Sequence, residues 1–225
     1  MNVIDLSMPV DEGHFRWPIQ RGKKGDFADG DLFEASWFQT SCHGFTHVDA
    51  PRHMVPGGET LDGLDLNRVV GRAAVIDLSG IDPMTEIVPS HLENAATHLA
   101  PGEIALFRTC WDTQRDWHAP AFWRDSPYLS RAACEWLLDK RPCACAFDFP
   151  QDYTIRLLLD GDIRPIVEHV SHDVLLRNNV TLIEYLVNTS AVTTAHTLLA
   201  AQPIRLAGAD GAPARVVAIQ NARPT

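Results

Sequence analysis

Three short apolar runs, separated by segments with helical features, constrain the fold of this chain most strongly. They occupy residues 71–78 (GRAAVIDL), 104–109 (IALFRT) and 143–149 (CACAFDF). Continuous apolar character over so few residues is typical of strands that are buried on both faces. Strands that alternate with helices predict an α/β fold, in which a central mixed sheet is flanked by helices.

The segments between these runs carry helix signals. Ser90 and Glu93 have the spacing of a capping box, which predicts a helix that ends near Pro101. Ser130 is placed to cap a second helix that continues through Asp139. Residues 162–177 have apolar side chains at helical spacing and predict a third helix.

Further strands complete the expected sheet. Extended stretches are expected at residues 2–6, 33–48 and 180–186. Residues 203–206 and 214–219 flank a Gly-Ala-Asp-Gly turn and predict a C-terminal hairpin. Because no repeat, low-complexity tract or linker divides the sequence, we expect a single domain over residues 1–225.

Composition excludes some classes of partner. The chain has 225 residues, is 45% hydrophobic and has a formal net charge of -10. It therefore offers no broad cationic surface for nucleic acid or an anionic membrane, and a small-molecule substrate is the better expectation. The N-terminus lacks the basic start and apolar run of a secretory signal, which predicts a cytoplasmic protein. Five cysteines, an odd number in a chain of this size, favour reduced thiols.

The segment CHGFTHVDAPRH, residues 42–53, contains the main candidates for metal binding and catalysis. Pro51 disfavours a helix here, whereas the period of two in a strand would direct His43, His47, Asp49 and His53 to one face. Imidazole nitrogen and carboxylate oxygen are suitable ligands for zinc or manganese. The alternatives are a structural hydrogen-bond network and solvated loop residues. Clustering favours a metal site over both.

This segment resembles the cyclase-type metal-dependent hydrolases, a family that includes kynurenine formamidase and isatin hydrolase. The family motif has His, three residues, His, one residue, Asp, Ala-Pro or similar, and a further His, and HGFTHVDAPRH has this spacing throughout. A later His followed twelve residues on by Glu is also typical, and His172 and Glu184 have that offset. The resemblance covers nearly the whole chain. It implies the swivelling β/β/α arrangement of the family and a homodimer.

The resemblance also implies a role for each residue. His43, His47 and Asp49 would hold one divalent ion, either Zn²⁺ or Mn²⁺. His172 would join a second ion, with Asp49 and Glu184 bridging the two.

Two further residues receive roles by resemblance. His53 is not among these ligands and would transfer protons. Trp17, which precedes Pro18, stands where the family places a tryptophan that contacts substrate. The alternative for Trp17 is a buried anchor of the N-terminal loop. His169 rivals His172 as a ligand but lacks the twelve-residue offset, so we assign it to structure.

Departures from the family pattern leave the substrate open. Many relatives have His-Thr-Gly-Thr-His where this chain has His-Gly-Phe-Thr-His, so Phe45 would alter the wall of the pocket. Ile19-Gln20 also follows Pro18 where relatives with formamidase activity often have Gly-Asp. These changes affect which substrate binds more than whether hydrolysis occurs.

Three functions are compatible with these residues. The first is an arylformamidase-like amidohydrolase, in which metal-bound hydroxide attacks the carbonyl of a small amide such as N-formylkynurenine. The second is a hydrolase or cyclase that acts on a cyclic amide or lactone, as isatin hydrolase does. The third is a non-catalytic metal-binding protein. His53 favours the first two, because a purely structural site needs no free base.

Overall fold

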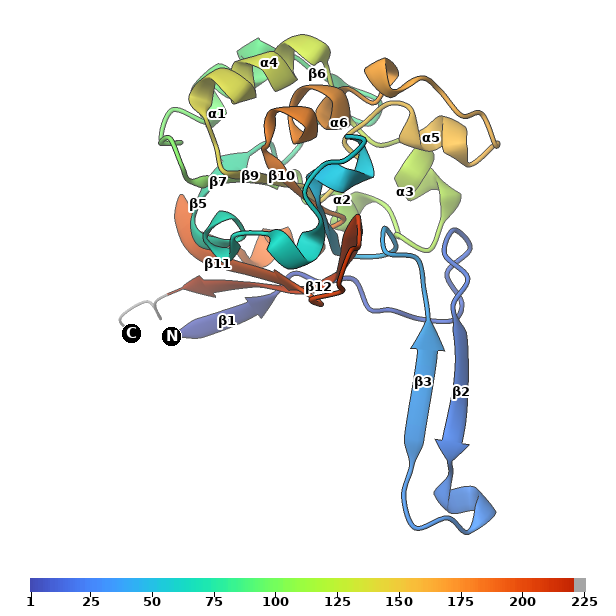
Figure 1. The fold of residues 1–225 in the computed structure, drawn as a ribbon. Helices are drawn as coiled ribbons and strands as arrows, with labels where there is room; N and C mark the ends of the chain where they lie inside the picture. The colour runs from blue at the N-terminus through green and yellow to red at the C-terminus, as the bar shows by residue number, and fades with distance from the viewer. Residues whose placement is uncertain (221–225) are drawn as a thin grey trace.

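A computed structural model describes residues 1–220, and most of its strands belong to one sheet (Figure 1). These strands are β1 (Asn2–Asp5), β4 (His47–Asp49), β5 (Val70–Asp77), β7 (Ile104–Arg108), β9 (Ala144–Ala146), β10 (Thr181–Glu184), β11 (His196–Pro203) and β12 (Gly211–Gln220). Their order is β1-β12-β11-β5-β7-β9-β10-β4, and the start of β12 also pairs with β4. This last pairing closes seven of the strands into a barrel, to which β1 adds along β12.

The barrel is a mixed sheet. β5, β7, β9 and β10 are parallel neighbours, whereas β4, β11 and β12 pair antiparallel to theirs. The expected α/β class and mixed sheet are therefore confirmed. The swivelling β/β/α arrangement stays a prediction.

Helices cover one side of the barrel. The α-helices are α1 (Pro89–Ala95), α2 (Trp111–Gln114), α3 (Pro120–Arg124), α4 (Arg131–Lys140), α5 (Ile155–Leu158) and α6 (Val170–Val174). In Figure 1, α1, α4 and α6 lie together above the strands, and α2, α3 and α5 gather beside them. Ser130 caps α4 as expected, since its Oγ accepts a hydrogen bond of 3.1 Å from the backbone N–H of Ala133.

The apolar core has two layers, and the strands alternate between them. On β5, Ala73 and Val75 face the barrel interior, whereas Ala74 and Ile76 pack outward with α1 and α4 side chains such as Leu92. Because both faces are buried, the strands read as continuous apolar runs. None of the helices in residues 1–220 is long and apolar enough to cross a membrane.

Two predicted helices differ from the structure. α1 ends at Ala95, well before Pro101, because the chain then turns back and the His98 ring hydrogen-bonds the carbonyl of Val75 at 3.0 Å. Its N-terminus is also different: the ring of His91, rather than Glu93, accepts the hydrogen bond from the N–H of Val88.

The helix predicted over residues 162–177 is broken into three pieces. These are a 3₁₀ turn (Ile166–Glu168), α6 and a second 3₁₀ turn (Leu176–Asn178). The first break falls at His169, whose ring hydrogen-bonds Thr154 at 2.9 Å and whose ψ of 75° is not helical. Side-chain bonding outside the segment therefore overrides the helical periodicity.

The predicted strand over residues 33–48 is also divided. Its first part forms β3 (Ala35–Gln39), which pairs with β2 (Gln20–Gly25) in a hairpin that projects far from the barrel (Figure 1). A short parallel pair, β6 (Glu86–Ile87) and β8 (Tyr128–Leu129), lies under the helices. A C-terminal hairpin is present, but its first strand, β11, ends at Pro203, so the prediction of a strand at residues 203–206 is wrong apart from that residue.

Candidate active site

The histidine-rich segment is a strand only at its centre. β4 contains His47 and Asp49, whereas His43 lies in the preceding turn and His53 ends a 3₁₀ turn (Pro51–His53). Phe45 has a positive φ of 57°, so the chain bends there. The prediction of one continuous strand is therefore wrong. The four side chains converge nevertheless, because the turns on either side of β4 fold back toward it.

Asp49 lies at the centre of the cluster and is completely buried. Its Oδ1 is 2.8 Å from Nδ1 of His43 and 3.2 Å from Nε2 of His47, and its Oδ2 is 3.4 Å from Nε2 of His172. Glu184 is the cross-strand partner of His47 in the β10–β4 ladder. Its carboxylate lies 3.5 Å from Nε2 of His47 and 3.3 Å from Nε2 of His172. All five predicted ligands therefore meet at one place.

Outer hydrogen bonds fix which nitrogen of two histidines points inward. The Nδ1–H of His47 donates to the carbonyl of Phe45 at 2.8 Å, since a carbonyl oxygen can only accept. The Nδ1 of His172 is likewise 2.6 Å from the carboxylate of Asp152. In both cases the Nε2 lone pair is left to face Asp49 and Glu184. Carboxylate and carbonyl partners of this kind orient histidine ligands in many metal sites.

Asp210 supplies a corresponding contact to His43. Its Oδ2 is 3.0 Å from Nε2 of His43, so Nδ1 of that ring faces Asp49. Asp210 lies in the turn between β11 and β12, where its carbonyl accepts a hydrogen bond from the N–H of Ala50. The next residue must be glycine, because a Cβ at Gly211 would lie 2.6 Å from Cε1 of His43.

His53 lies at the rim of the cluster. Its ring stacks on that of His43 with 3.8 Å between centroids, and its Nδ1 is 3.8 Å from Oδ2 of Asp210. The side chain keeps 24% of its surface exposed, whereas His47 keeps 1%. His53 can therefore be reached from solvent, while His47 cannot.

The residues present fit a divalent metal. Nε2 of His47 and Oδ2 of Asp49 are buried and have no hydrogen-bond partner, which is costly unless another group binds them. Within residues 1–220, two sets offer ligand atoms that lie within 4.8 Å of one another: His47, Asp49 and Glu184, and His43, Asp49 and His53. Two ligand atoms about 2.0–2.2 Å from a tetrahedral zinc ion lie about 3.3–3.6 Å apart, which is close to the 3.2 Å and 3.5 Å from Nε2 of His47 to Asp49 and Glu184.

The electrostatics of the cluster also favour a cation. Burial opposes protonation of His43, but Asp49 and Asp210 outweigh it and raise the pKa of His43 to about 9. Burial similarly opposes ionisation of Asp49, yet His47 and His172 hold the pKa of that carboxyl well below its usual range. Burial lowers the pKa of His53 to about 4. The carboxylates thus favour positive charge on His43, whereas His53 remains neutral.

Trp17 lies beside the cluster in a group of aromatic rings. It is 8% exposed, and its ring lies 5.1 Å from that of Phe45, 5.0 Å from Trp123 and 5.3 Å from Tyr185. The ring of Tyr185 in turn lies 5.3 Å from that of His47. Trp17 is therefore a packed residue of the N-terminal loop and also a near neighbour of the predicted ligands.

Sequence reasoning gave no positioning role to Asp152, Gln151 and Asp210. Asp152 bonds His172, and Gln151 donates to the carboxylate of Glu184. Both stand in the loop after β9, a strand end where site residues are common, so their position was a usable signal. Asp210 gave no such signal, because a turn of Gly, Ala, Asp and Gly is fully explained by turn chemistry.

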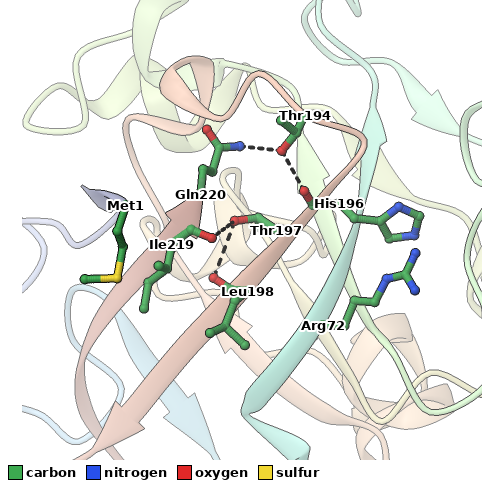
Figure 2. Close-up of a pocket in the computed structure, with 8 residues that line it drawn as sticks. All are labelled: Met1, Arg72, Thr194, His196, Thr197, Leu198, Ile219 and Gln220. Carbon is green, nitrogen blue, oxygen red and sulfur yellow. Dashed lines mark hydrogen bonds between the residues drawn. The ribbon is translucent and has the colours of Figure 1, made fainter. Parts of the chain in front are cut away.

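A separate pocket of about 560 Å³ lies on the outer side of β11 (Figure 2). Its lining includes Arg72, His196 and Leu198, and Figure 2 shows the side chains of Arg72 and His196 close together. No member of the histidine and carboxylate cluster lines it. The candidate site is instead the cluster at the junction of β4, β10 and α6.

Comparisons with known proteins identify relatives of similar sequence. The sequence model of a family described as putative cyclase matches residues 4–151. An isatin hydrolase of Roseibium aggregatum is 27% identical, over 97% of this chain and 87% of that protein. A kynurenine formamidase of Bacillus mycoides is 28% identical, over 95% of each.

Solved structures show the same fold. A potential metal-dependent hydrolase with cyclase activity superposes with a TM-score of 0.75 at 26% identity, and the match covers 96% of both chains. An isatin hydrolase bound to the product analogue thioisatinate superposes with a TM-score of 0.79 at 24% identity, over 96% of this chain and 91% of that one. The second match indicates a shared fold.

Proposed function

The chain belongs to the putative cyclase family, and from this premise we propose that it is a metal-dependent amidohydrolase that cleaves the carbon–nitrogen bond of a small aryl amide. The observation that carries the proposal is the buried carboxylate of Asp49, surrounded by nitrogens of three histidines and leaving Oδ2 without a hydrogen-bond partner. Formamides of aromatic amines, such as N-formylkynurenine, are the proposed substrate class.

The cluster has enough ligands for two ions. In this proposal His43, His47 and Asp49 hold the first, while Asp49, His172 and Glu184 hold the second. Three histidines and two carboxylates exceed what one tetrahedral ion requires. Zn²⁺ or Mn²⁺ suits this set of nitrogen and oxygen donors. Bound ions of this kind would supply Lewis acidity and lower the pKa of a water molecule.

Side chains of the protein would carry out proton transfer, ligand positioning and substrate binding. His53, neutral and partly exposed, would accept a proton from the attacking water and deliver it to the leaving nitrogen. Asp152, Gln151 and Asp210 would keep the inner side chains in position through their hydrogen bonds. Trp17 would contact the flat face of an aromatic substrate.

Ring-opening hydrolysis is the second candidate. The similarity to an isatin hydrolase supports it, at an identity close to that with the kynurenine formamidase. A bound cyclic amide presents the same carbonyl and nitrogen to the cluster, so the two reactions need the same machinery. A purely structural metal site fits these residues less well, because such a site needs no unliganded base like His53 beside the metal.

Elemental analysis combined with a substrate panel tests the proposal. We expect close to two divalent ions per chain and hydrolysis of at least one among N-formylkynurenine, formanilide, isatin and a small lactone. A metal content that stays at one ion after saturation with zinc or manganese would contradict the two-ion assignment. Hydrolysis of none of the four by the metal-loaded protein would contradict the function.

The assembly proposed for this chain is a homodimer of single domains, each spanning residues 1–225, of which 221–225 lie outside the described residues. The β2–β3 hairpin supports a dimer, because it projects from the barrel and exposes Phe33, Trp37 and Phe38 by 58%, 42% and 55%. Exposed apolar side chains gathered on one arm are typical of an interface. A second copy of this chain is the occupant we propose. A cytoplasmic location stays a prediction.

A further inference from the structure

Arg16 is a cation without an anionic partner in the described structure. None of the ion pairs described for residues 1–220 includes it, and its side chain donates no hydrogen bond there. Its Nη1 is nevertheless buried. A buried N–H group of a charged side chain that lacks an acceptor is expensive, so this guanidinium is prepared for an acceptor that is not part of the fold.

Two tryptophans hold the guanidinium in place. Its central carbon lies 4.5 Å from the ring centre of Trp123 and 5.3 Å from that of Trp17. Aromatic faces attract the cation but accept no in-plane hydrogen bond. The two rings therefore leave the buried Nη1 of Arg16 without a hydrogen-bond acceptor.

A pocket of about 330 Å³ lies next to Arg16. It is lined by Phe15, Arg16, Trp17, Leu158 and Leu159, so Arg16 is its single charged residue. Its volume is at the lower end of the range for small-molecule sites. A pocket in which aromatic and leucine side chains surround one guanidinium suits a flat molecule that carries one negative group.

The aromatic rings connect this pocket with the metal-ligand cluster. Trp17 lines the pocket and lies 5.3 Å from the ring of Tyr185, which lies 5.3 Å from the ring of His47. Trp17, the residue proposed to contact the substrate, therefore both lines the pocket that contains Arg16 and lies two ring contacts from His47. The chain's net charge of -10 would otherwise repel an anion, so a local cation is needed to attract one.

We propose that Arg16 binds a carboxylate of the aromatic substrate, and hence that this enzyme selects anionic aryl amides over neutral ones. The planar fork of a guanidinium matches the two oxygens of a carboxylate, which a lysine ammonium matches less well. This inference rests on the proposed amidohydrolase function, because it names the substrate class of that same site.

Matched substrates test the inference. Formanilide and the 2-, 3- and 4-formamidobenzoates differ only in a ring carboxylate. With the metal-loaded protein, we expect kcat/KM for the best of the three acids to exceed that for formanilide by about 10- to 100-fold. Arg16→Gln should lower kcat/KM for the acid about 10-fold or more beyond any loss for formanilide and so remove the preference, and Arg16→Lys should restore part of it. Arg72→Gln, which removes an equal charge from an exposed site on β5, should change neither rate.

A binding measurement without turnover completes the test. Calorimetry with the aminobenzoate product of the best acid should give tighter binding than with aniline, and Arg16→Gln should weaken only the former. No preference for any of the three acids in the wild type, or an equal loss for acid and formanilide in Arg16→Gln, would overturn the inference. Failure to hydrolyse the acids by protein that hydrolyses another substrate of the panel would also overturn the inference, whereas hydrolysis of no substrate at all would instead contradict the proposed function.

Discussion

Asp210 lies 3.0 Å from Nε2 of His43, although 167 residues separate the two in the sequence. This contact leaves Nδ1 of His43 facing Asp49, so it sets the ring orientation that a metal ligand needs. We expect Asp210→Asn to weaken metal binding by about 10- to 100-fold, as is usual when a carboxylate behind a histidine ligand is removed. Competition with a chromogenic chelator measures the dissociation constant.

Asp82→Asn is the matched control for this change, since Asp82 is exposed and makes no described side-chain hydrogen bond. It should bind metal as the wild type does. Nitrogen-15 spectra of the zinc-loaded protein should also place the proton of His43 on Nε2. Equal affinity in Asp210→Asn and wild type would contradict a positioning role for Asp210.

His53 and His47 should respond differently to truncation. His53→Ala should keep its metal and lose about a hundredfold to ten-thousandfold in kcat, because it lacks a proton carrier at the rim of the cluster. His47→Ala should lose both metal and activity, since the buried Nε2 faces Asp49 and Glu184 directly. Metal content and turnover are measured on the same samples, and circular dichroism checks folding. If His53→Ala lost metal as readily as His47→Ala, His53 would be a ligand and the site would lack its proposed base.

The raised pKa of Asp148 predicts how the stability of the protein depends on pH. Burial raises the pKa of Asp148 to about 6, against the opposing effect of hydrogen bonds from Thr189, Thr109 and Cys110. Because this value lies above the ordinary 3.8, the stabilising contribution of the protonated form is complete below about pH 3.8 and is lost as the pH rises through 6.

Asp148→Asn cannot titrate and so lacks this pH-dependent contribution. Urea denaturation should give a lower free energy of unfolding for Asp148→Asn, because the amide offers fewer acceptors. The difference from wild type should shrink by about 1 kcal/mol between pH 5 and pH 7.5. A difference that stays constant or grows over this range would contradict the raised pKa.

The projecting hairpin should control assembly. Light scattering should give the mass of two chains for the wild type, and Phe38→Asp should shift it toward one by placing a charge in the apolar contact. Gln39→Asp, a neighbouring exposed position on β3, should leave the dimer intact. A wild-type mass of one chain at micromolar concentration would contradict the dimer.

Local sequence signals predicted β5, β7, β9, β10 and the cap of α4, because these depend on side chains within a few residues of each other. They failed for α1 and for residues 162–177, where His98 and His169 make hydrogen bonds outside their own segment. Because β5 and β7 are buried on both faces, their sequences are continuous apolar runs, which predicted them as strands. The hairpin arm was not predicted, since its exposed aromatic residues do not alternate with polar ones.

At the candidate site, the spacing predicted that four side chains converge, but for a wrong local reason. His43, His47, Asp49 and His53 do converge, yet only His47 and Asp49 do so through strand periodicity. The bend at Phe45 and the 3₁₀ turn after Ala50 bring in the other two. Contacts such as that of Asp210 depend on barrel closure between β12 and β4, which no local pattern encodes.

Reversible loss of activity on chelation tests the central claim most directly. The purified protein is assayed with the best substrate of the panel as isolated, after exhaustive chelation, and after readdition of Zn²⁺ or Mn²⁺. We expect chelation to abolish turnover and metal to restore it, with circular dichroism unchanged throughout. Turnover that persists undiminished in protein shown by elemental analysis to be free of metal would contradict metal-dependent hydrolysis at Asp49.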